Sequence, residues 1–210
     1  MAIFLLLAIP FFSLGITTYY YKDRFSINLP LVTFLKGIIC FFIALLFYLI
    51  IRSFFRPSFT GWGFYAFHLV YDHLLYVVLA IGGLFLFNGV PDGYNQQENI
   101  FESYIFLSGF FSLVAFVDFV ENINRFDFFI LFLLPLLRIA TVLAATIFLV
   151  QFINDTSYMR FAFLAGLILL PFVLNLITVL FFSKIIFFAI IFTLLAIGGS
   201  LFLFYLYKDG

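Results

Sequence analysis

Hydrophobic residues occupy long, nearly unbroken stretches of this chain, and most of the charged residues lie in the short segments between them. Seven apolar stretches can be marked, at residues 2–20, 31–51, 64–87, 103–120, 128–152, 161–182 and 185–207. A transmembrane helix needs about 20 mostly apolar residues, because in hydrocarbon the backbone must satisfy its own hydrogen bonds. The pattern therefore predicts an all-α, polytopic transmembrane bundle of about seven helices, which together take up nearly the whole chain.

The composition agrees with a lipid-covered surface. Of the 210 residues, 66% are hydrophobic and 10% are charged, whereas soluble domains are about 25% charged. Ten basic residues balance ten acidic ones, and the single cysteine, Cys40, lies in an apolar stretch. These observations argue against a disordered chain, a nucleic-acid partner and a disulfide scaffold. We expect a single integral membrane domain, residues 1–210, with the lipid bilayer as its partner and no cofactor.

The orientation of the chain in the membrane is weakly specified. The stretch 2–20 has no basic residue ahead of it, so it is interpreted as a helix and not as a signal peptide. We call the rim that holds the amino terminus the first rim and the opposite one the second rim. Lysines and arginines are nearly equal in number at the two rims. The basic residues Lys22 and Arg24, which follow the stretch 2–20, favour an outside amino terminus and an inside carboxyl terminus. A bacterial inner membrane or an organellar membrane fits this arrangement.

Two segments of the chain have almost the same sequence. Leu79–Phe87 is LAIGGLFLF, and Leu195–Phe204 is LAIGGSLFLF, with one inserted serine. One interpretation is an internal duplication, with two parallel three-helix repeats at 1–87 and 127–207 joined by a linker helix at 103–120. The default interpretation is that both glycine pairs let helices pack closely, without any duplication.

The prolines provide a second indication of repeats. Pro10, Pro30, Pro135 and Pro171 lie in or at the first, second, fifth and sixth apolar stretches. A three-one-three layout with prolines in these helices resembles the SWEET-type sugar transporters, which implies transport by rocking of the two halves. The resemblance is one of layout, because no sequence motif of that family is present and Pro30 stands at a helix entrance.

A small set of polar residues interrupts the apolar stretches, mostly toward the first rim. Ionisable groups at membrane depth are costly and usually face the bundle interior or water, so they are functional candidates. The predicted substrate or ion pathway consists of His68, Asp72, Asp118, Glu121, Arg138 and Asn175. We expect Asp72 to pair with Arg138, because an unpaired arginine at this depth is expensive. Such a pair would serve either transport or the architecture of the bundle.

The same residues suggest a second chemistry. His68 and Asp72 have the i,i+4 spacing of two metal ligands on one helix face, and Asp118 with Glu121 could complete an oxygen-rich shell. These fragments resemble pieces of the CAAX-type intramembrane proteases, which implies a metal-dependent hydrolase. The order of the motifs differs from that family, and Val120 stands where its first glutamate is required.

Three functions follow, and each predicts a different geometry. A transporter or permeation protein, the preferred interpretation, requires Asp72, Arg138 and Asn175 to line a cavity near the midplane. A non-catalytic membrane subunit, with a homo-oligomer or a membrane complex as its partner, requires the same residues to be locked in a dry core. An intramembrane hydrolase, the alternative we favour least, requires His68, Asp72 and a further carboxylate within reach of one metal ion.

Overall fold

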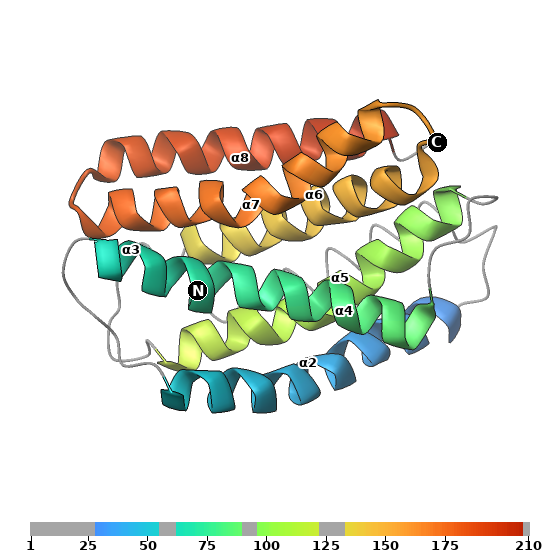
Figure 1. Cartoon of the computed structure of the whole chain (residues 1–210), viewed down its shortest axis with the longest axis horizontal. Helices are drawn as coiled ribbons and strands as arrows, with labels where there is room; N and C mark the ends of the chain where they lie inside the picture. Colours follow the sequence, from blue (N-terminus) through green and yellow to red (C-terminus); the bar gives the residue numbers. More distant parts are fainter. Residues whose placement is uncertain (1–27, 55–61, 90–95, 122–132, 208–210) are drawn as a thin grey trace.

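The computed structural model describes residues 28–54, 62–89, 96–121 and 133–207, and within these ranges the protein is helical without any strand. The elements are α2 (Asn28–Phe54), α3 (Trp62–His68), the π-helical η1 (Leu69–Leu74), α4 (Leu75–Asn88), α5 (Gln96–Glu121), α6 (Leu134–Asn154), α7 (Met159–Phe182) and α8 (Ile186–Tyr207) (Figure 1). Since α3, η1 and α4 follow one another without a break, they form one continuous helical span.

Six of these spans are long and apolar enough to cross a membrane, as expected of an integral multi-pass membrane protein. They correspond to six of the seven predicted stretches, and the predicted helix at 2–20 lies outside the described residues. The largest difference in the boundaries is at α5, which begins at Gln96 and not at residue 103. Its first turn is polar, but Gln and Glu are good helix formers, and Glu98 there also interacts favourably with the helix dipole.

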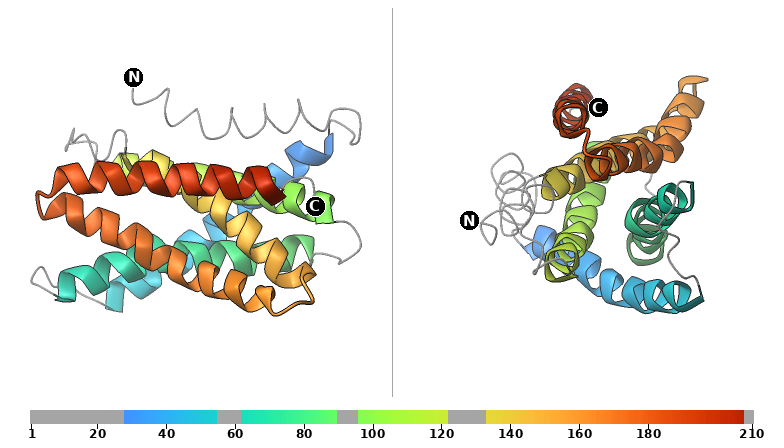
Figure 2. Two further views of the ribbon diagram at one scale, coloured as in Figure 1. Left: turned by 90° about the horizontal axis from the view of Figure 1, so that it is seen from above. Right: turned by 90° about the vertical axis from the view of Figure 1, so that its left-hand side faces the viewer.

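The bundle is organised around α5 and α6, which pack against each other. α2 packs on α5 and α4, whereas α7 and α8 pack on α6 and on each other. The end-on view in Figure 2 shows the consequence, with α2 and α4 on one side of the bundle and α7 and α8 on the other. η1 packs against α7, so the π-helical segment lies where the two sides meet.

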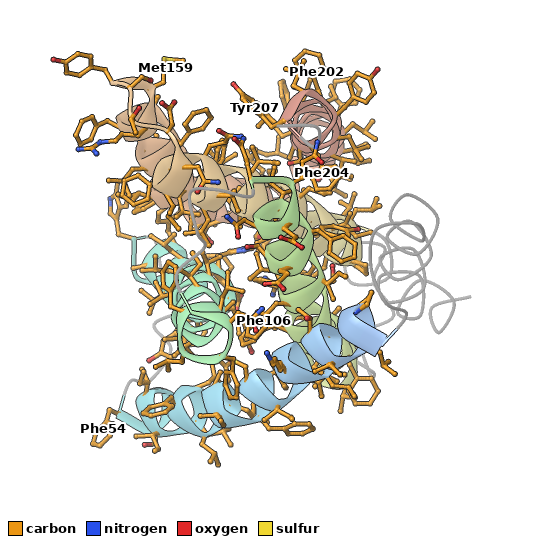
Figure 3. The ribbon with its side chains drawn as sticks, turned by 90° about the vertical axis from the view of Figure 1, so that its right-hand side faces the viewer. Phe54, Phe106, Met159, Phe202, Phe204 and Tyr207 are labelled. Atoms are coloured by element: carbon orange, nitrogen blue, oxygen red, sulfur yellow. The ribbon has the colours of Figure 1, made fainter. Side chains whose placement is uncertain are left out.

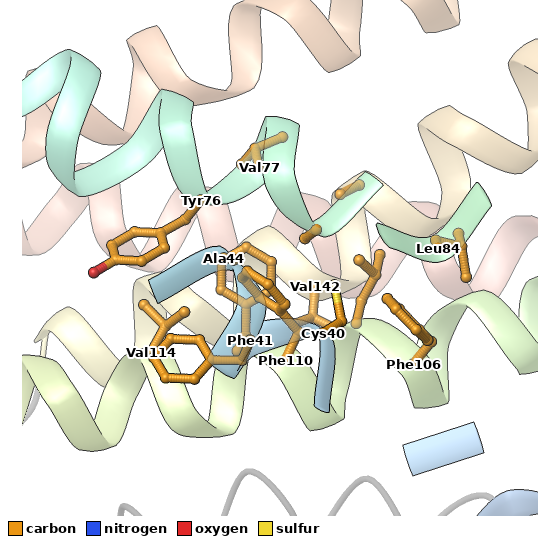
Figure 4. Packing of buried hydrophobic residues seen from close by; sticks show 14 of the residues in the cluster. Cys40, Phe41, Ala44, Tyr76, Val77, Leu84, Phe106, Phe110, Val114 and Val142 are labelled. Atoms are coloured by element: carbon orange, nitrogen blue, oxygen red, sulfur yellow. The ribbon is translucent and has the colours of Figure 1, made fainter. Parts of the chain in front are cut away.

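The main hydrophobic core lies between α2, α4, α5 and α6. Figure 4 shows part of this cluster, where the rings of Phe41 and Phe110 meet edge to face with centroids 5.5 Å apart. The backbones of α2 and α5 approach closely at two glycines. A Cβ added at Gly37 would overlap the carbonyl of Phe106, and one added at Gly109 would overlap the carbonyl of Phe34. Small residues that allow such close approach are a common basis of helix packing in membranes.

The two glycine pairs do not share a packing role. A Cβ added at Gly83 would overlap the sulfur of Cys40, so this glycine is required for the contact of α4 with α2. In contrast, a Cβ added at Gly198 or Gly199 would meet nothing within 4 Å. The default expectation of a common packing role is therefore wrong for the α8 pair, and the repeat arrangement is not confirmed.

The prolines and the outer surface complete the fold. Pro135 stands in the first turn of α6, where its missing N–H is tolerated, whereas Pro171 lies buried inside α7. The outer face of α8 carries large apolar side chains, including Phe202, which is 62% exposed and labelled at the edge of the bundle in Figure 3. Apolar exposure of this kind is what lipid contact requires.

Candidate functional site

Arg138 is the centre of the polar site and joins three elements. Its side chain leaves α6 and is buried, with 1% of the residue exposed. Its Nε donates to Oδ2 of Asp118 on α5 at 2.9 Å, and its Nη1 donates to the backbone carbonyl of Asp72 in η1 at 2.7 Å. The guanidinium carbon also lies 5.5 Å from the centroid of the Tyr76 ring, within the range of a cation–π interaction. One arginine therefore connects α5, α6 and the span that contains η1.

The predicted ion pair between Asp72 and Arg138 is wrong in its acidic partner. Asp118 supplies the carboxylate, and Asp72 contributes its carbonyl oxygen. The carboxylate of Asp72 instead contacts Nδ1 of His68, one turn earlier on the same span. The prediction assumed α-helical geometry throughout 64–87, and a π-helical turn changes the direction in which the following side chains leave the helix.

His68 and Asp72 lie at a less buried level than Arg138. The exposed fraction of the side chain is 18% for His68 and 33% for Asp72, compared with 2% for Arg138. The imidazole of His68 is stacked on the ring of Phe182 with centroids 5.6 Å apart, and the ring of Phe64 meets it at 4.3 Å. The polar pair is thus held against aromatic side chains of α3 and α7.

His73 belongs to the site, although the sequence analysis did not include it. Its Nε2 lies 3.1 Å from the hydroxyl oxygen of Thr178 on α7, and the residue is 1% exposed. The hydroxyl of Thr178 donates to the carbonyl of Leu174 at 3.3 Å. The His73 tautomer that carries its proton on Nε2 satisfies both contacts at once, because the single hydrogen of the Thr178 hydroxyl is then used toward Leu174. An ionisable side chain inside an apolar stretch was the available signal, and His73 carries it as clearly as His68 does.

Asn175 is fully buried on α7 and donates from Nδ2 to the backbone carbonyl of Tyr65 at 3.0 Å. Of the predicted site residues, the structure thus joins His68 with Asp72 and Asp118 with Arg138, and places Asn175 where α7 packs on α3 and η1. Glu121 is the last residue of α5, and its side chain lies outside the described part of the structure.

Three buried polar atoms of this site have no hydrogen-bond partner among the described residues. They are Nη2 of Arg138, Nδ1 of His73 and Oδ1 of Asn175. A polar atom buried without a partner costs on the order of 1–3 kcal/mol, because it loses its interaction with water and gains none in return. These atoms mark a place with hydrogen-bonding capacity that the described residues leave unused.

The metal interpretation finds no assembled ligand set in the described ranges. No group of three or more His, Cys, Asp or Glu side chains that could hold an ion occurs within them. Of the proposed ligands, Asp118 is bound to Arg138, and His68 and Asp72 bind each other.

The polar groups at the second rim are separate from this site. Nζ of Lys36 donates to Oδ1 of Asn88 at 3.2 Å and to the carbonyl of Phe87 at 3.4 Å. Between α6 and α7, Asp155 accepts a hydrogen bond from the backbone N–H of Ser157 at 2.7 Å. Hydrogen bonding from Ser157 holds the pKa of Asp155 below its usual range. These contacts organise the ends of the helices.

Comparison with known proteins yields no relative: no protein family, no curated protein and no solved structure matches the chain. The fold and the site together define a multi-pass helical membrane protein with a buried polar network around η1. The function must therefore be argued from this network.

Proposed function

We propose that the protein is a small transport or permeation protein, which carries a small solute or an ion across the membrane through the polar network around η1. The observation that carries the proposal is the set of unpartnered atoms on Arg138, His73 and Asn175, which come from three different spans. A purely architectural network would be expected to satisfy its own buried groups, because half-satisfied networks are less stable than apolar packing.

A gradient of exposure supports a path from the first rim. His68 and Asp72 are partly exposed, and the next polar group, Arg138, is buried. Arg138 is linked to the carbonyl of Asp72, so the exposed and buried groups are neighbours. This order of polar groups suits a solute that enters at the rim and moves toward the interior, where ionisable residues commonly mark substrate or ion pathways.

Two local departures from regular helix suit a protein that changes shape. The π-helical turn at Leu69–Leu74 lies within a membrane span, and such turns are frequent at functional sites. Pro171 interrupts the hydrogen bonding of α7 within two turns of Asn175 and Thr178. Both features lie on the spans that hold the network, where a small bend would alter the access of a solute to Arg138.

The test is flux through the purified full-length chain in liposomes. The panel of probes is potassium, chloride, protons, urea and glycerol, each compared with protein-free liposomes. We expect transport of at least one probe and a reduction of about tenfold or more in Asp72→Asn, which replaces the carboxylate that holds His68 at the entrance. The matched control is Asp155→Asn, which removes an exposed carboxylate far from the network.

Both variants must elute like the native chain and remain folded at the temperature of the assay, so that a loss of flux is not a loss of fold. Absence of flux for all five probes contradicts the proposal. Equal flux in Asp72→Asn and the native chain would also contradict it, because the path would then avoid the polar network.

A non-catalytic subunit of a membrane complex is the second candidate function. It is favoured by the burial of Arg138 and Asn175, which are 1% and 0% exposed, the dry arrangement expected of a scaffold. A homo-oligomer or a complex with other membrane proteins would then be the functional unit. Native mass spectrometry of the chain extracted from its own membrane distinguishes this candidate: a complex of fixed stoichiometry, together with no flux from the chain alone, supports it.

A further inference from the structure

We infer that the solute held at the network is small, uncharged and able both to donate and to accept hydrogen bonds, as a small amide or a small polyol does. This inference rests on the proposed transport function and assigns its substrate class. It follows from which polar atoms are unused around η1, and from the charges already compensated there.

The unused atoms belong to neighbouring parts of the structure. Nη1 of Arg138 contacts the carbonyl of Asp72, and His73 is the next residue. His73 contacts Thr178, which lies one helical turn from Asn175 on α7. The three residues that carry unused atoms are each at least 99% buried. The contacts of Arg138 with Asp72 and of His73 with Thr178 thus join α6, η1 and α7, the elements on which the unused atoms lie.

The hydrogen-bond roles of two of these atoms can be assigned. Nδ2 of Asn175 donates to the carbonyl of Tyr65, so the unused amide atom, Oδ1, is an acceptor. In the neutral His73 tautomer that donates from Nε2 to Thr178, the other nitrogen, Nδ1, is an acceptor. Nη2 of Arg138 carries two N–H donors. The network thus offers two acceptors and one donor group.

The charges of the network disfavour an ion as the bound solute. The guanidinium of Arg138 already has the carboxylate of Asp118 at 2.9 Å. An anion bound at Nη2 would meet this carboxylate and the lone pairs of His73 and Asn175. A cation would meet the guanidinium, and among the described residues of the network both carboxylates are already engaged, Asp118 by Arg138 and Asp72 by His68. An uncharged molecule with both N–H or O–H donors and an acceptor complements all three unused atoms.

The surrounding packing limits the size of the solute. Leu137, Leu174 and Ile177, which neighbour these residues on α6 and α7, are each 1% exposed. A large solute would have to displace these side chains, and packed interiors resist such changes. Urea and glycerol are suitable probes because each is small, uncharged and rich in both donors and acceptors.

The experiment measures urea and glycerol permeability by stopped-flow light scattering of liposomes that contain the full-length chain. Two variants of similar side-chain volume, Asn175→Leu and His73→Phe, remove one unused acceptor each, together with the hydrogen bond to Tyr65 or to Thr178. We expect the permeability of both probes to exceed that of protein-free liposomes, and each variant to reduce it by about tenfold, as loss of a buried hydrogen bond predicts. The matched control is Thr146→Val, whose hydroxyl donates within α6 to the carbonyl of Val142.

A second measurement needs no substitution. If the two probes share one site, excess urea should reduce the glycerol flux, and both fluxes should saturate with concentration. Potassium, chloride or proton flux without any urea or glycerol flux would overturn the substrate class and leave the transport function standing. Absence of flux for every probe would overturn both. Urea and glycerol fluxes that neither saturate nor compete would also overturn the shared site.

Discussion

Two helices of this protein carry almost the same sequence in opposite surroundings. In α4 the segment Leu79–Phe87 turns one face to the core, where Ala80 and Leu84 are buried and a Cβ added at Gly83 would overlap the sulfur of Cys40. In α8 the segment Leu195–Phe204 lies at the surface, where Gly198 and Gly199 meet nothing within 4 Å. The difference shows that an apolar sequence in a membrane protein does not select between protein and lipid neighbours, because both are equally apolar.

The contrast extends to polar chemistry. In the most apolar part of α6, which contains Arg138, 72% of the residues are buried. In the most apolar part of α8, which contains no ionisable residue, 17% of the residues are buried. The buried hydroxyl of Thr193 on α8 donates to the carbonyl of Ala189 within its own helix. The hydrogen bond of Thr193 thus stays within α8, whereas those of Arg138 connect α6 to α5 and η1.

The largest expected effect tests the interior side of this contrast. Asp118→Asn leaves the guanidinium of Arg138 without its carboxylate, and breaking a buried ion pair costs about 3–5 kcal/mol. The midpoint of thermal unfolding in lipid nanodiscs should therefore fall steeply. The double variant Asp118→Leu with Arg138→Met should recover much of the loss, because it leaves no buried charge. If the single variant unfolds like the native chain, the ion pair does not stabilise the bundle.

Close backbone packing should give the next largest effect. Gly109→Ala places a Cβ on the carbonyl of Phe34, and a backbone atom cannot rotate away. Separation of α2 from α5 should cost about 3 kcal/mol, the upper part of the range for overpacking. The midpoint of chemical unfolding measures this loss. Gly82→Ala, at a glycine with nothing within 4 Å of the added Cβ, is the control and should not reproduce it.

The comparison of the glycine pairs gives a smaller and more specific effect. Gly83→Ala meets the sulfur of Cys40, a side-chain atom that can move, so the loss should be about 1 kcal/mol. The equivalent Gly199→Ala should stabilise α8 by up to about 1 kcal/mol, since alanine is the better helix former. Adding Cys40→Ala should relieve the Gly83→Ala variant in a double-mutant cycle. Equal effects at both glycines would mean that the two environments are alike.

The smallest effect concerns the exposed connection between α6 and α7. The pKa of Asp155 is lowered in the folded protein by hydrogen bonds from Ser157, so the carboxylate stabilises the turn above its ordinary pKa. This contribution is lost as the pH falls through the lowered pKa. Asp155→Asn should therefore lower the unfolding temperature slightly at neutral pH. At a pH well below the carboxyl range the variant and the native chain should be indistinguishable, and a difference that persists there would contradict this origin.

Much of the fold could be predicted because hydrophobic length alone identifies a spanning helix. Six predicted stretches correspond to six observed spans. The start of α5 could not be placed in this way, since polar residues such as Glu98 can extend a helix beyond its apolar part. The π-helical turn at Leu69–Leu74 could not be predicted from the sequence either, because no residue type requires it.

The candidate residues were chosen from the sequence by their type, but the contacts between helices could not be predicted in the same way. Arg138 was expected to need a carboxylate, and it has one, but from Asp118 and not from Asp72. His73 carried the same signal as His68, an ionisable side chain in an apolar stretch, but its partner Thr178, 105 positions away, was visible only in the structure. Pairings between helices depend on rotation, depth and crossing, none of which is encoded in the spacing of residues along a single helix.

The sequence by itself determined that the chain forms apolar helices of membrane-spanning length and that the costly polar groups gather toward one rim. Only the tertiary structure decided which carboxylate neutralises Arg138, which one of the four paired glycines is packed and which buried atoms have no partner among the described residues. The physical reason is that the hydrophobic drive into lipid acts on each helix separately. Packing and hydrogen bonding between helices instead depend on close contacts at atomic distances.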